Sequence, residues 1–223
     1  EKASQEEIDA AVKALNEALE ALEKKPDPTE PQEPVELPYE DVAENDWFYD
    51  GVYYNYTAKI MTGKDTTHFV PYENLARAQF AVILHRLSGK PDVTYKVRFP
   101  DVPDGQFYSK AVIWAADTKV VNGYTDTGLF GPSDYINREQ MAVMMYRYAK
   151  YRKYDVSEKA DYSQFTDAAS VSEFAGEAMQ WAVGSGIITG KDYGTRLDPQ
   201  GNASRAECAI IIQRFMEKYG EES

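Results

Sequence analysis

The chain has 223 residues, 43% of them hydrophobic, and a formal net charge of −13 at pH 7. This length can bury a substantial core, while the negative charge disfavours binding to nucleic acid or to an anionic membrane surface. No run of about 18 apolar residues is present, so we expect no membrane insertion. Because Cys208 is the single cysteine and there are only two histidines, an intrachain disulfide is excluded, and neither a metal site nor a cofactor is expected.

Residues 1–25 have the pattern of one amphipathic helix. Ser4 and Glu7 form a capping-box signature near its start. Apolar side chains follow near heptad spacing at Ile8, Val12, Leu15, Leu19 and Leu22. The segment resembles the last helix of the small three-helix FIVAR modules of extracellular bacterial proteins, and we expect it to be part of an upstream module.

Residues 26–38 form a segment rich in proline and glutamate. This composition predicts an extended, semi-rigid linker. The chain begins without Met and without a signal-type segment, so we expect it to be a fragment of a longer, multidomain surface protein.

One sequence pattern then occurs three times, in residues 39–90 (copy one), 97–152 (copy two) and 163–219 (copy three). Each copy has an aspartate in an aromatic phrase, then an aromatic residue six or seven positions on, a glycine in a turn-rich loop, a proline and an arginine. In chain order these are Asp41, Trp47, Gly63, Pro71 and Arg77; Asp101, Phe107, Gly123, Pro132 and Arg138; and Asp167, Phe174, Gly190, Pro199 and Arg205. A period of about 60 residues predicts three copies of one supersecondary unit, each relying on its neighbours to bury its apolar face.

Each copy is predicted to form a helix, a loop and a second helix. The second helix has apolar residues at i, i+3, i+4 and i+7, which indicates a core-facing stripe. These are Phe80, Ile83, Leu84 and Leu87 in copy one, Met141, Met144, Met145 and Tyr148 in copy two, and Cys208, Ile211, Ile212 and Phe215 in copy three. Trp114 and Trp181 are predicted to lie in the core with the first helices. Strand-like runs are short, so we predict a mainly α fold.

The arginine at the start of each second helix is not explained by helix capping. Ser204 with Glu207 completes a capping box, Asn137 with Gln140 provides a serviceable one, and Ala76 lacks the capping oxygen. The helix macrodipole disfavours a cation at this end. Each arginine therefore needs a partner, which is either an internal carboxylate such as that of the copy's aspartate or an external anion.

A second set of arginines lies nine residues further along each copy. These are Arg86, Arg147 and Arg214. Cations are favourable in the last turn of a helix, so this set is predicted to be structural.

The composite pattern resembles that of the S-layer homology (SLH) domain in three tandem copies. The matching elements are Phe99-Pro100-Asp101-Val102, the aromatic, Trp114-Ala115, the glycine, the proline and the phrase Ser204-Arg205-Ala206-Glu207. The resemblance implies a closed, three-pronged pseudo-trimer around a helical bundle. It also implies noncovalent anchoring of an extracellular protein to the cell wall or S-layer surface, through a secondary cell wall polysaccharide with pyruvate ketals on an amino sugar.

By matching position, the resemblance implies ligand-binding grooves between copies. The implied groove residues are Arg77, Arg138, Arg205, Asp41, Asp101, Asp167, Gly63, Gly123, Gly190, Trp47 and Tyr124. A guanidinium holds a carboxylate through two parallel charge-assisted bonds, and aromatic faces suit sugar rings. In copy two Glu139 stands next to Arg138, and we expect it to compete with the ligand for that arginine.

Two other classes of function are open at this point. A helical repeat scaffold that binds a protein or peptide predicts an open superhelix to which further copies could be added. An enzyme would need a carboxylate constellation that departs from the repeat, and none is evident. We therefore expect a monomeric, non-catalytic anchor, with any catalytic domain in an upstream part of the parent protein.

Overall fold

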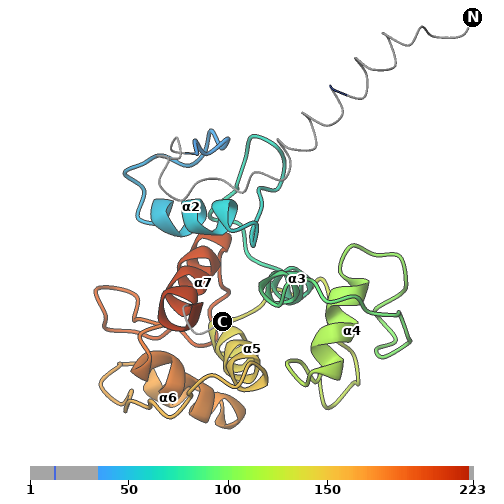
Figure 1. Ribbon diagram of the computed structural model, residues 1–223. Coiled ribbons are helices and arrows are strands. Elements are labelled where there is room, and N and C mark those ends of the chain that lie inside the picture. Colours follow the sequence, from blue (N-terminus) through green and yellow to red (C-terminus); the bar gives the residue numbers. More distant parts are fainter. Residues whose placement is uncertain (1–12, 14–34, 221–223) are drawn as a thin grey trace, which may run out of the picture. The chain divides into compact units, whose positions relative to one another are not determined.

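The computed structural model describes Lys13 and residues 35–220 (Figure 1). The predicted amphipathic helix at 1–25 and most of the predicted linker at 26–38 lie outside the described residues. From residue 37 onward the chain forms one compact unit. In residues 35–220 no helix is long and apolar enough to cross a membrane.

The described residues contain two helices for each copy of the pattern. These are α2 (Tyr49–Thr57) and α3 (Arg77–Leu87), α4 (Ser109–Asp117) and α5 (Arg138–Tyr151), and α6 (Gly176–Gly184) and α7 (Arg205–Tyr219), with short 3-10 turns at Ala168–Ser170 and Glu173–Ala175. Within residues 35–220 only isolated β-bridges occur and no strand forms. The prediction of a mainly α fold is confirmed.

The helices pair between copies and not within them. The α3 helix packs against α4, α5 packs against α6, and α7 packs against α2 (Figure 1). The second helix of each copy thus covers the first helix of the following copy, and the last helix returns to the first copy. This pairing is the reason why one copy alone cannot bury its apolar stripe.

Small residues allow the close approach of α2 and α7. A Cβ atom added to Gly51 would lie 2.9 Å from the backbone nitrogen of Ile210, so only glycine fits at this contact. The buried Asn55 side chain donates a hydrogen bond of 2.9 Å to the carbonyl of Ala209 and so joins the two helices.

Three residues that precede the second helices are joined in a ring of hydrogen bonds. The Leu75 N–H donates to the Ala203 carbonyl, the Ile136 N–H to the Leu75 carbonyl, and the Ala203 N–H to the Ile136 carbonyl, each at 2.9 Å. All three residues are completely buried. Each copy is therefore bonded to both others, whereas the symmetric three-pronged shape that the resemblance implies stays a prediction.

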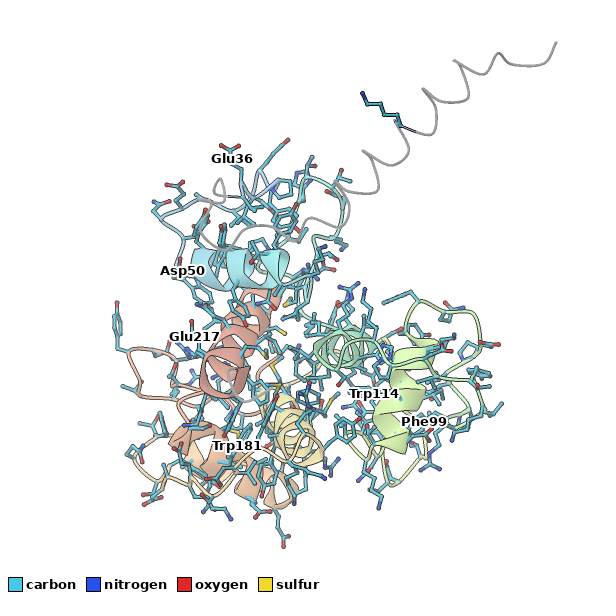
Figure 2. All side chains as sticks on the ribbon, in the orientation of Figure 1. Glu36, Asp50, Phe99, Trp114, Trp181 and Glu217 are labelled. Carbon is cyan, nitrogen blue, oxygen red and sulfur yellow. The ribbon has the colours of Figure 1, made fainter. Side chains whose placement is uncertain are left out.

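The core contains the apolar stripes predicted from the sequence. Trp181 is buried and contacts Tyr146 of α5 and Phe215 of α7, with ring centroids 5.4 and 6.5 Å apart (Figure 2). Trp114 and Cys208 are also buried, as predicted. These contacts fix the second helices around one another and so position the arginines at their starts.

Candidate functional site

Three cavities in the described part of the chain each contain one arginine from the start of a second helix. The Arg77 groove has a volume of about 280 Å³, the Arg205 groove about 300 Å³ and the Arg138 groove about 570 Å³. Small-molecule sites typically enclose roughly 300–1,000 Å³, so these volumes suit ligands of the size of one or two sugar residues.

Each groove is built from all three copies in the same way. One copy supplies the arginine at the start of a second helix, another supplies the loop glycine and a later arginine of its own second helix, and the third supplies an aromatic side chain. The Arg77 groove contains Gly123, Arg147 and Phe174; the Arg205 groove contains Gly63, Arg86 and Phe107; and the Arg138 groove contains Gly190, Arg214 and Trp47. A complete groove therefore requires residues that lie far apart in the sequence.

The three arginines at the helix starts are buried, with 4–6% of each residue exposed. The Nε–H groups of Arg77, Arg138 and Arg205 donate to the carbonyls of Phe130, Leu197 and Phe69, at 3.0, 2.8 and 2.8 Å. The Nε–H partners are thus backbone carbonyls of another copy, which neither of the two sequence-based alternatives included. Burial lowers the pKa of each guanidinium group, and arginine still carries its charge at neutral pH.

A second hydrogen bond differs among the three arginines. In Arg138 and Arg205 the Nη2 group donates to a loop carbonyl, that of Thr189 at 3.0 Å and that of Thr62 at 2.7 Å. In Arg77 the Nη1 group donates instead to the Gln140 side-chain oxygen, at 3.2 Å. The three grooves are therefore chemically unequal.

The aspartates of the repeated pattern hold loops and do not line the grooves. Each carboxylate accepts hydrogen bonds from two consecutive backbone N–H groups in the loop that precedes the second helix of its copy. The pairs are Phe69 and Val70 for Asp41, Phe130 and Gly131 for Asp101, and Leu197 and Asp198 for Asp167, all at 2.7–2.9 Å. These carboxylates orient the loops whose carbonyls receive the arginines.

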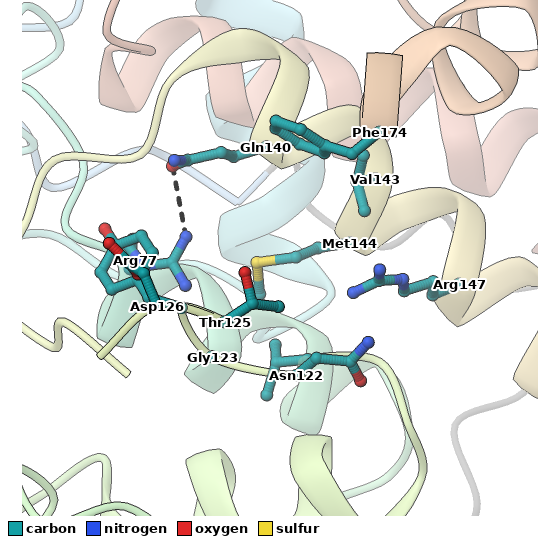
Figure 3. Close-up of a pocket in the computed structure, with 12 residues that line it drawn as sticks. Arg77, Asn122, Gly123, Thr125, Asp126, Gln140, Val143, Met144, Arg147 and Phe174 are labelled. Atoms are coloured by element: carbon teal, nitrogen blue, oxygen red, sulfur yellow. Dashed lines mark hydrogen bonds between the residues drawn. The ribbon is translucent and has the colours of Figure 1, made fainter. Parts of the chain in front are cut away.

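The Arg77 groove combines two cations with apolar and aromatic walls (Figure 3). The guanidinium carbon of Arg77 lies 4.6 Å from the centre of the Tyr124 ring, and the Tyr124 hydroxyl donates to Asp134 at 2.9 Å. Figure 3 shows the side chains of Arg77 and Arg147 pointing toward each other from opposite sides of the groove. Val143 lies on the same side as Arg147 and provides apolar surface. Arg77 and Tyr124 both line this groove, and their contact with a ligand stays a prediction.

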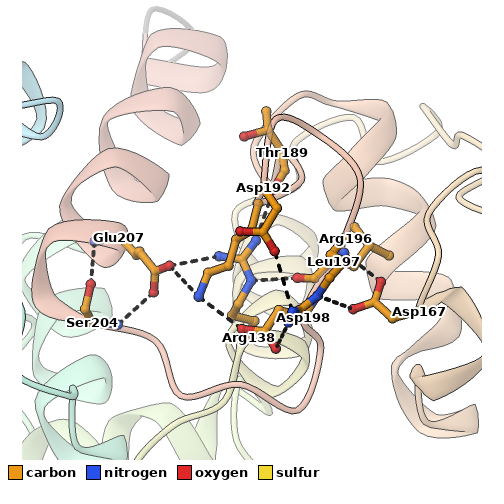
Figure 4. Close-up of polar contacts among 10 residues, drawn as sticks. Arg138, Asp167, Thr189, Asp192, Arg196, Leu197, Asp198, Ser204 and Glu207 are labelled. Carbon is orange, nitrogen blue, oxygen red and sulfur yellow. Dashed lines mark hydrogen bonds and ion pairs between the residues drawn. The ribbon is translucent and has the colours of Figure 1, made fainter.

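The Arg138 groove already contains a carboxylate (Figure 4). Glu207 lies 2.8 Å from the Lys191 amine and 3.7 Å from Nη1 of Arg138. Lys191 also contacts Asp198, at 3.1 Å. The cations of this groove are therefore balanced by acidic side chains of the chain itself.

Glu139 does not contact Arg138, contrary to the expectation that it would compete for that arginine. Its carboxylate accepts hydrogen bonds from the Ser172 N–H and hydroxyl and from the Gln200 amide, at 2.8–2.9 Å. The first residue of a helix and the next point about 100° apart, and Glu139 is directed at copy three through that rotation.

The Arg205 groove has its arginines bonded to the protein. Arg205 donates to two loop carbonyls, as described above, and Arg86 donates to the Ile60 carbonyl at 3.1 Å. Lys64 at the edge of the groove forms an ion pair of 2.6 Å with Glu73. The cationic groups here are held by internal partners.

The loop glycines lie where the loops touch the aromatic rings of the first phrase. A Cβ atom on Gly123 would lie 2.6 Å from the Phe99 ring, and its φ of +72° also favours glycine. Gly63 and Gly190 approach Tyr39 and Phe165 in the same way. All three glycines line a groove, and their contact with a ligand stays a prediction.

The aromatics that follow the aspartates are exposed at the grooves. Trp47 is 59% exposed, Phe107 75% and Phe174 62%. An exposed aromatic beside a cationic cavity offers a flat apolar face to a ligand. Trp47 was predicted from the sequence as a ligand contact, and Phe107 and Phe174 occupy the equivalent positions.

The second arginine set, which the sequence analysis interpreted as structural, also lines the grooves. Nine residues of an α-helix are two and a half turns, so the two arginines of one second helix lie on opposite faces. On α5, Arg138 enters one groove and Arg147 enters another. The nine-residue spacing of the two arginines was visible in the sequence. The pairing of helices from different copies, which places the two arginines in different grooves, was not.

The model of the family described as S-layer homology domain matches residues 38–81, 98–142 and 164–209. Similar proteins include an amylopullulanase of Thermoanaerobacterium thermosulfurigenes, 32% identical over 82% of this chain and 10% of that protein, and a surface-layer 125 kDa protein of Lysinibacillus sphaericus, 25% identical over 72% of this chain and 13% of that protein. A cellulosome-anchoring protein of Acetivibrio thermocellus is 26% identical over 67% of this chain and 34% of that protein.

The chain spans between a tenth and about a third of the length of these relatives. It matches the proteins with enzyme names only through its repeats, which are non-catalytic in this family. The three matched segments contain the ring of hydrogen bonds and the arginines at the starts of the second helices. The chain belongs to the S-layer homology domain family.

Proposed function

We propose that this chain anchors a bacterial surface protein noncovalently to the cell wall, by binding a pyruvylated secondary cell wall polysaccharide in the grooves between its repeats. Membership of the S-layer homology family supports the anchoring role. Relatives named as a surface-layer protein and as a cellulosome-anchoring protein support a location at the cell surface or cell wall. The single observation that supports the chemistry best is that every groove is lined by both a buried arginine and an exposed aromatic side chain.

The chemistry of the Arg77 groove favours an acidic sugar over a neutral one. Arg77 and Arg147 bring two positive charges into one cavity, where a carboxylate can accept charge-assisted hydrogen bonds. Phe174 offers an apolar face that suits the ring of a sugar residue. A ketal-linked pyruvate places a carboxylate on the sugar ring itself, so one residue of the polymer satisfies both features.

The overall charge of the chain predicts how this binding responds to salt. The chain carries −13 and the proposed polymer is also acidic, so their long-range interaction is repulsive. Moderate salt screens this repulsion more strongly than it screens the contact in the groove. We expect salt to leave the affinity nearly unchanged or to raise it slightly.

The test of this function is calorimetric titration with pyruvylated polymer and with the same polymer after chemical removal of pyruvate. We expect binding to the first and at least a tenfold weaker binding to the second, since a charge-assisted contact contributes about 1.5–3 kcal/mol. Equal affinity for both polymers would remove the carboxylate from the mechanism. A steep loss of affinity with rising salt would also contradict the proposal.

The alternative of an open helical scaffold for a protein or peptide is disfavoured by the contacts. A superhelix to which copies can be added needs a free face at each end. The mutual hydrogen bonds of Leu75, Ile136 and Ala203 instead bond each copy to both others. A monomeric state stays a prediction, which sedimentation equilibrium can check.

A further inference from the structure

We propose that Asn122 is a site of spontaneous deamidation, with the backbone nitrogen of Gly123 as the nucleophile, and that the carboxylate so formed adds a negative charge to the Arg77 groove. Asn122 is the only asparagine of the sequence that is followed by glycine. Glycine has no Cβ atom and adopts many backbone conformations, so its nitrogen can approach the preceding side chain closely. The reaction is independent of the proposed function, whereas its consequence for a ligand rests on that function.

The peptide bond between Asn122 and Gly123 is held less firmly than its equivalents in the other copies. There the residue before the groove glycine is Thr62 or Thr189, and its carbonyl accepts a hydrogen bond from Nη2 of a helix-start arginine, at 2.7 or 3.0 Å. Nothing in the described part of the chain donates to the Asn122 carbonyl, because Arg77 donates to other acceptors. This peptide unit is therefore freer to rotate than the other two.

The backbone N–H of Gly123 also has no acceptor. In copy one the N–H of Gly63 donates to the Tyr39 hydroxyl at 2.6 Å. Copy two has Phe99 in place of that tyrosine, and within residues 35–220 the N–H of Gly123 makes no hydrogen bond. An N–H group without an acceptor can lose its proton and react without first giving up a hydrogen bond.

The side chain of Asn122 is free to reach the glycine nitrogen. Asn122 is exposed, and its amide makes no hydrogen bond to the residues that the structure describes. By contrast, the buried Asn55 amide donates to the carbonyls of Gly51 and Ala209, at 2.8 and 2.9 Å. A reaction between neighbouring groups needs access to a near-attack conformation, which an unrestrained side chain can sample.

The reaction balances with water alone as co-reactant. The Gly123 nitrogen bonds to Cγ of Asn122, and the side-chain amide leaves as ammonia together with the proton of the Gly123 N–H. The product is a five-membered succinimide ring. Water then breaks one of the two bonds from the ring nitrogen to a carbonyl carbon. Cleavage at Cγ gives aspartate, and cleavage at the main-chain carbonyl gives isoaspartate, so each route leaves one new carboxylate. Asparagine belongs to the thermolabile residues for this reason.

Both products change the Arg77 groove. Asn122 and Arg147 both line this groove, and Figure 3 shows their side chains at the same end of it. A new carboxylate there can form a charge-assisted hydrogen bond with a guanidinium group. Isoaspartate also lengthens the main chain by one carbon next to Gly123, where a Cβ atom would already lie 2.6 Å from the Phe99 ring. We therefore expect the isoaspartate form to melt at a lower temperature than the aspartate form.

The experiment is incubation of the folded chain in warm, mildly alkaline buffer, followed by tryptic peptide mapping with mass spectrometry. The peptide of residues 120–138 contains Asn122, and isoaspartyl methyltransferase reports the isoaspartate product. The same peptide in free form gives the intrinsic rate. We expect Asn122 to convert faster than any other asparagine and within about tenfold of the free peptide, because no hydrogen bond has to be broken.

Two variants test the structural cause. Asn122→Thr introduces the residue of the other two copies and is expected to abolish the reaction, since threonine has no side-chain carbonyl. Phe99→Tyr offers Gly123 the hydroxyl acceptor that Tyr39 offers Gly63, and is expected to slow the reaction about fivefold in the folded chain. Residue 99 lies outside the free peptide, so the intrinsic rate serves both chains.

The outcomes separate the reaction from its consequence. If Asn122 stays intact in the folded chain while the free peptide converts, the proposal is overturned. If Phe99→Tyr reacts as fast as the unmodified chain, the missing acceptor is not the cause.

Asn122→Asp reproduces the aspartate product and is expected to bind pyruvylated polymer about tenfold more weakly than Asn122→Thr, because like charges repel. Equal affinity of the two variants would overturn the consequence for the groove, and both the reaction and anchoring would stand. If the unmodified chain does not bind the polymer at all, the proposed function fails and the mass-spectrometric result still decides the reaction.

Discussion

Replacement of Arg138 by alanine should destabilise the whole folded unit, because this side chain ties copy two to copy three. Arg138 is 4% exposed and donates to the carbonyls of Leu197 and Thr189, at 2.8 and 3.0 Å. Each bond joins a charged donor to a backbone acceptor, and such bonds contribute about 1.5–3 kcal/mol each. Truncation also leaves both carbonyls without this donor.

The sum of the two bonds predicts a loss of about 3–6 kcal/mol, a large part of the roughly 5–15 kcal/mol that stabilises a typical domain. For a unit of this size 1 kcal/mol shifts the melting temperature by about 2–4 °C, so we expect a decrease of at least about 6 °C. Differential scanning calorimetry and far-UV circular dichroism measure this shift. A single transition is expected, since the ring of hydrogen bonds couples the copies.

Arg147→Ala is the matched control, because it removes an arginine from the same helix that has no hydrogen bond or ion pair in residues 35–220. Its melting temperature should stay within about 2 °C of the unmodified chain. If Arg138→Ala melted within the same margin, the carbonyl contacts would not hold the copies together. Internal hydrogen bonds would then not distinguish structural arginines from ligand-binding ones.

Three further predictions concern single residues. Burial raises the pKa of the Cys208 thiol, so the folded chain should not react with a thiol reagent such as dithionitrobenzoate until it unfolds; rapid labelling would contradict its place in the core. Partial burial opposes ionisation of Asp167, but backbone N–H donors and Arg196 outweigh it and lower the pKa; the stabilisation is then present above the unfolded pKa of about 3.9 and is lost as pH falls through the folded value. The melting temperatures of the unmodified chain and of Asp167→Asn should therefore converge as pH falls from about 4 through the lowered pKa of Asp167, and a pH-independent difference would argue otherwise. Gly123→Ala should lower stability by at least about 1–2 kcal/mol in urea unfolding, because φ is +72° and the new Cβ would meet the Phe99 ring; an unchanged midpoint would show that the loop adjusts freely.

The helices and their core faces could be predicted from the sequence because they depend on local patterns. The apolar spacing that includes Phe80 and Leu84 identified the buried face of α3, and the capping box at Ser204 marked the start of α7. Which helix packs on which could not be predicted in this way. The same apolar stripe fits a helix of its own copy or of the next one, and only the tertiary contacts show that α3 packs against α4.

The partners of the charged residues were the least predictable part of the site. An arginine or aspartate in a sequence suggests an opposite charge, but backbone groups are available at every residue and leave no mark in the sequence. Asp101 receives the N–H groups of Phe130 and Gly131, and Arg77 donates to the carbonyl of Phe130. One loop thus satisfies both side chains at once, which explains why neither needs the other as an ion-pair partner.

The construction of every groove from three copies links anchoring to stability. A ligand that binds only the folded chain stabilises it by RT ln(1 + [L]/Kd), which is about 2.7 kcal/mol when the ligand concentration is a hundred times Kd. In the Arg77 groove this stabilisation would depend on Arg77, Arg147 and Phe174, and each of these residues belongs to a different copy. Separation of any copy would therefore both break the ring of backbone hydrogen bonds and dismantle the groove, so a loaded anchor resists unfolding as one unit.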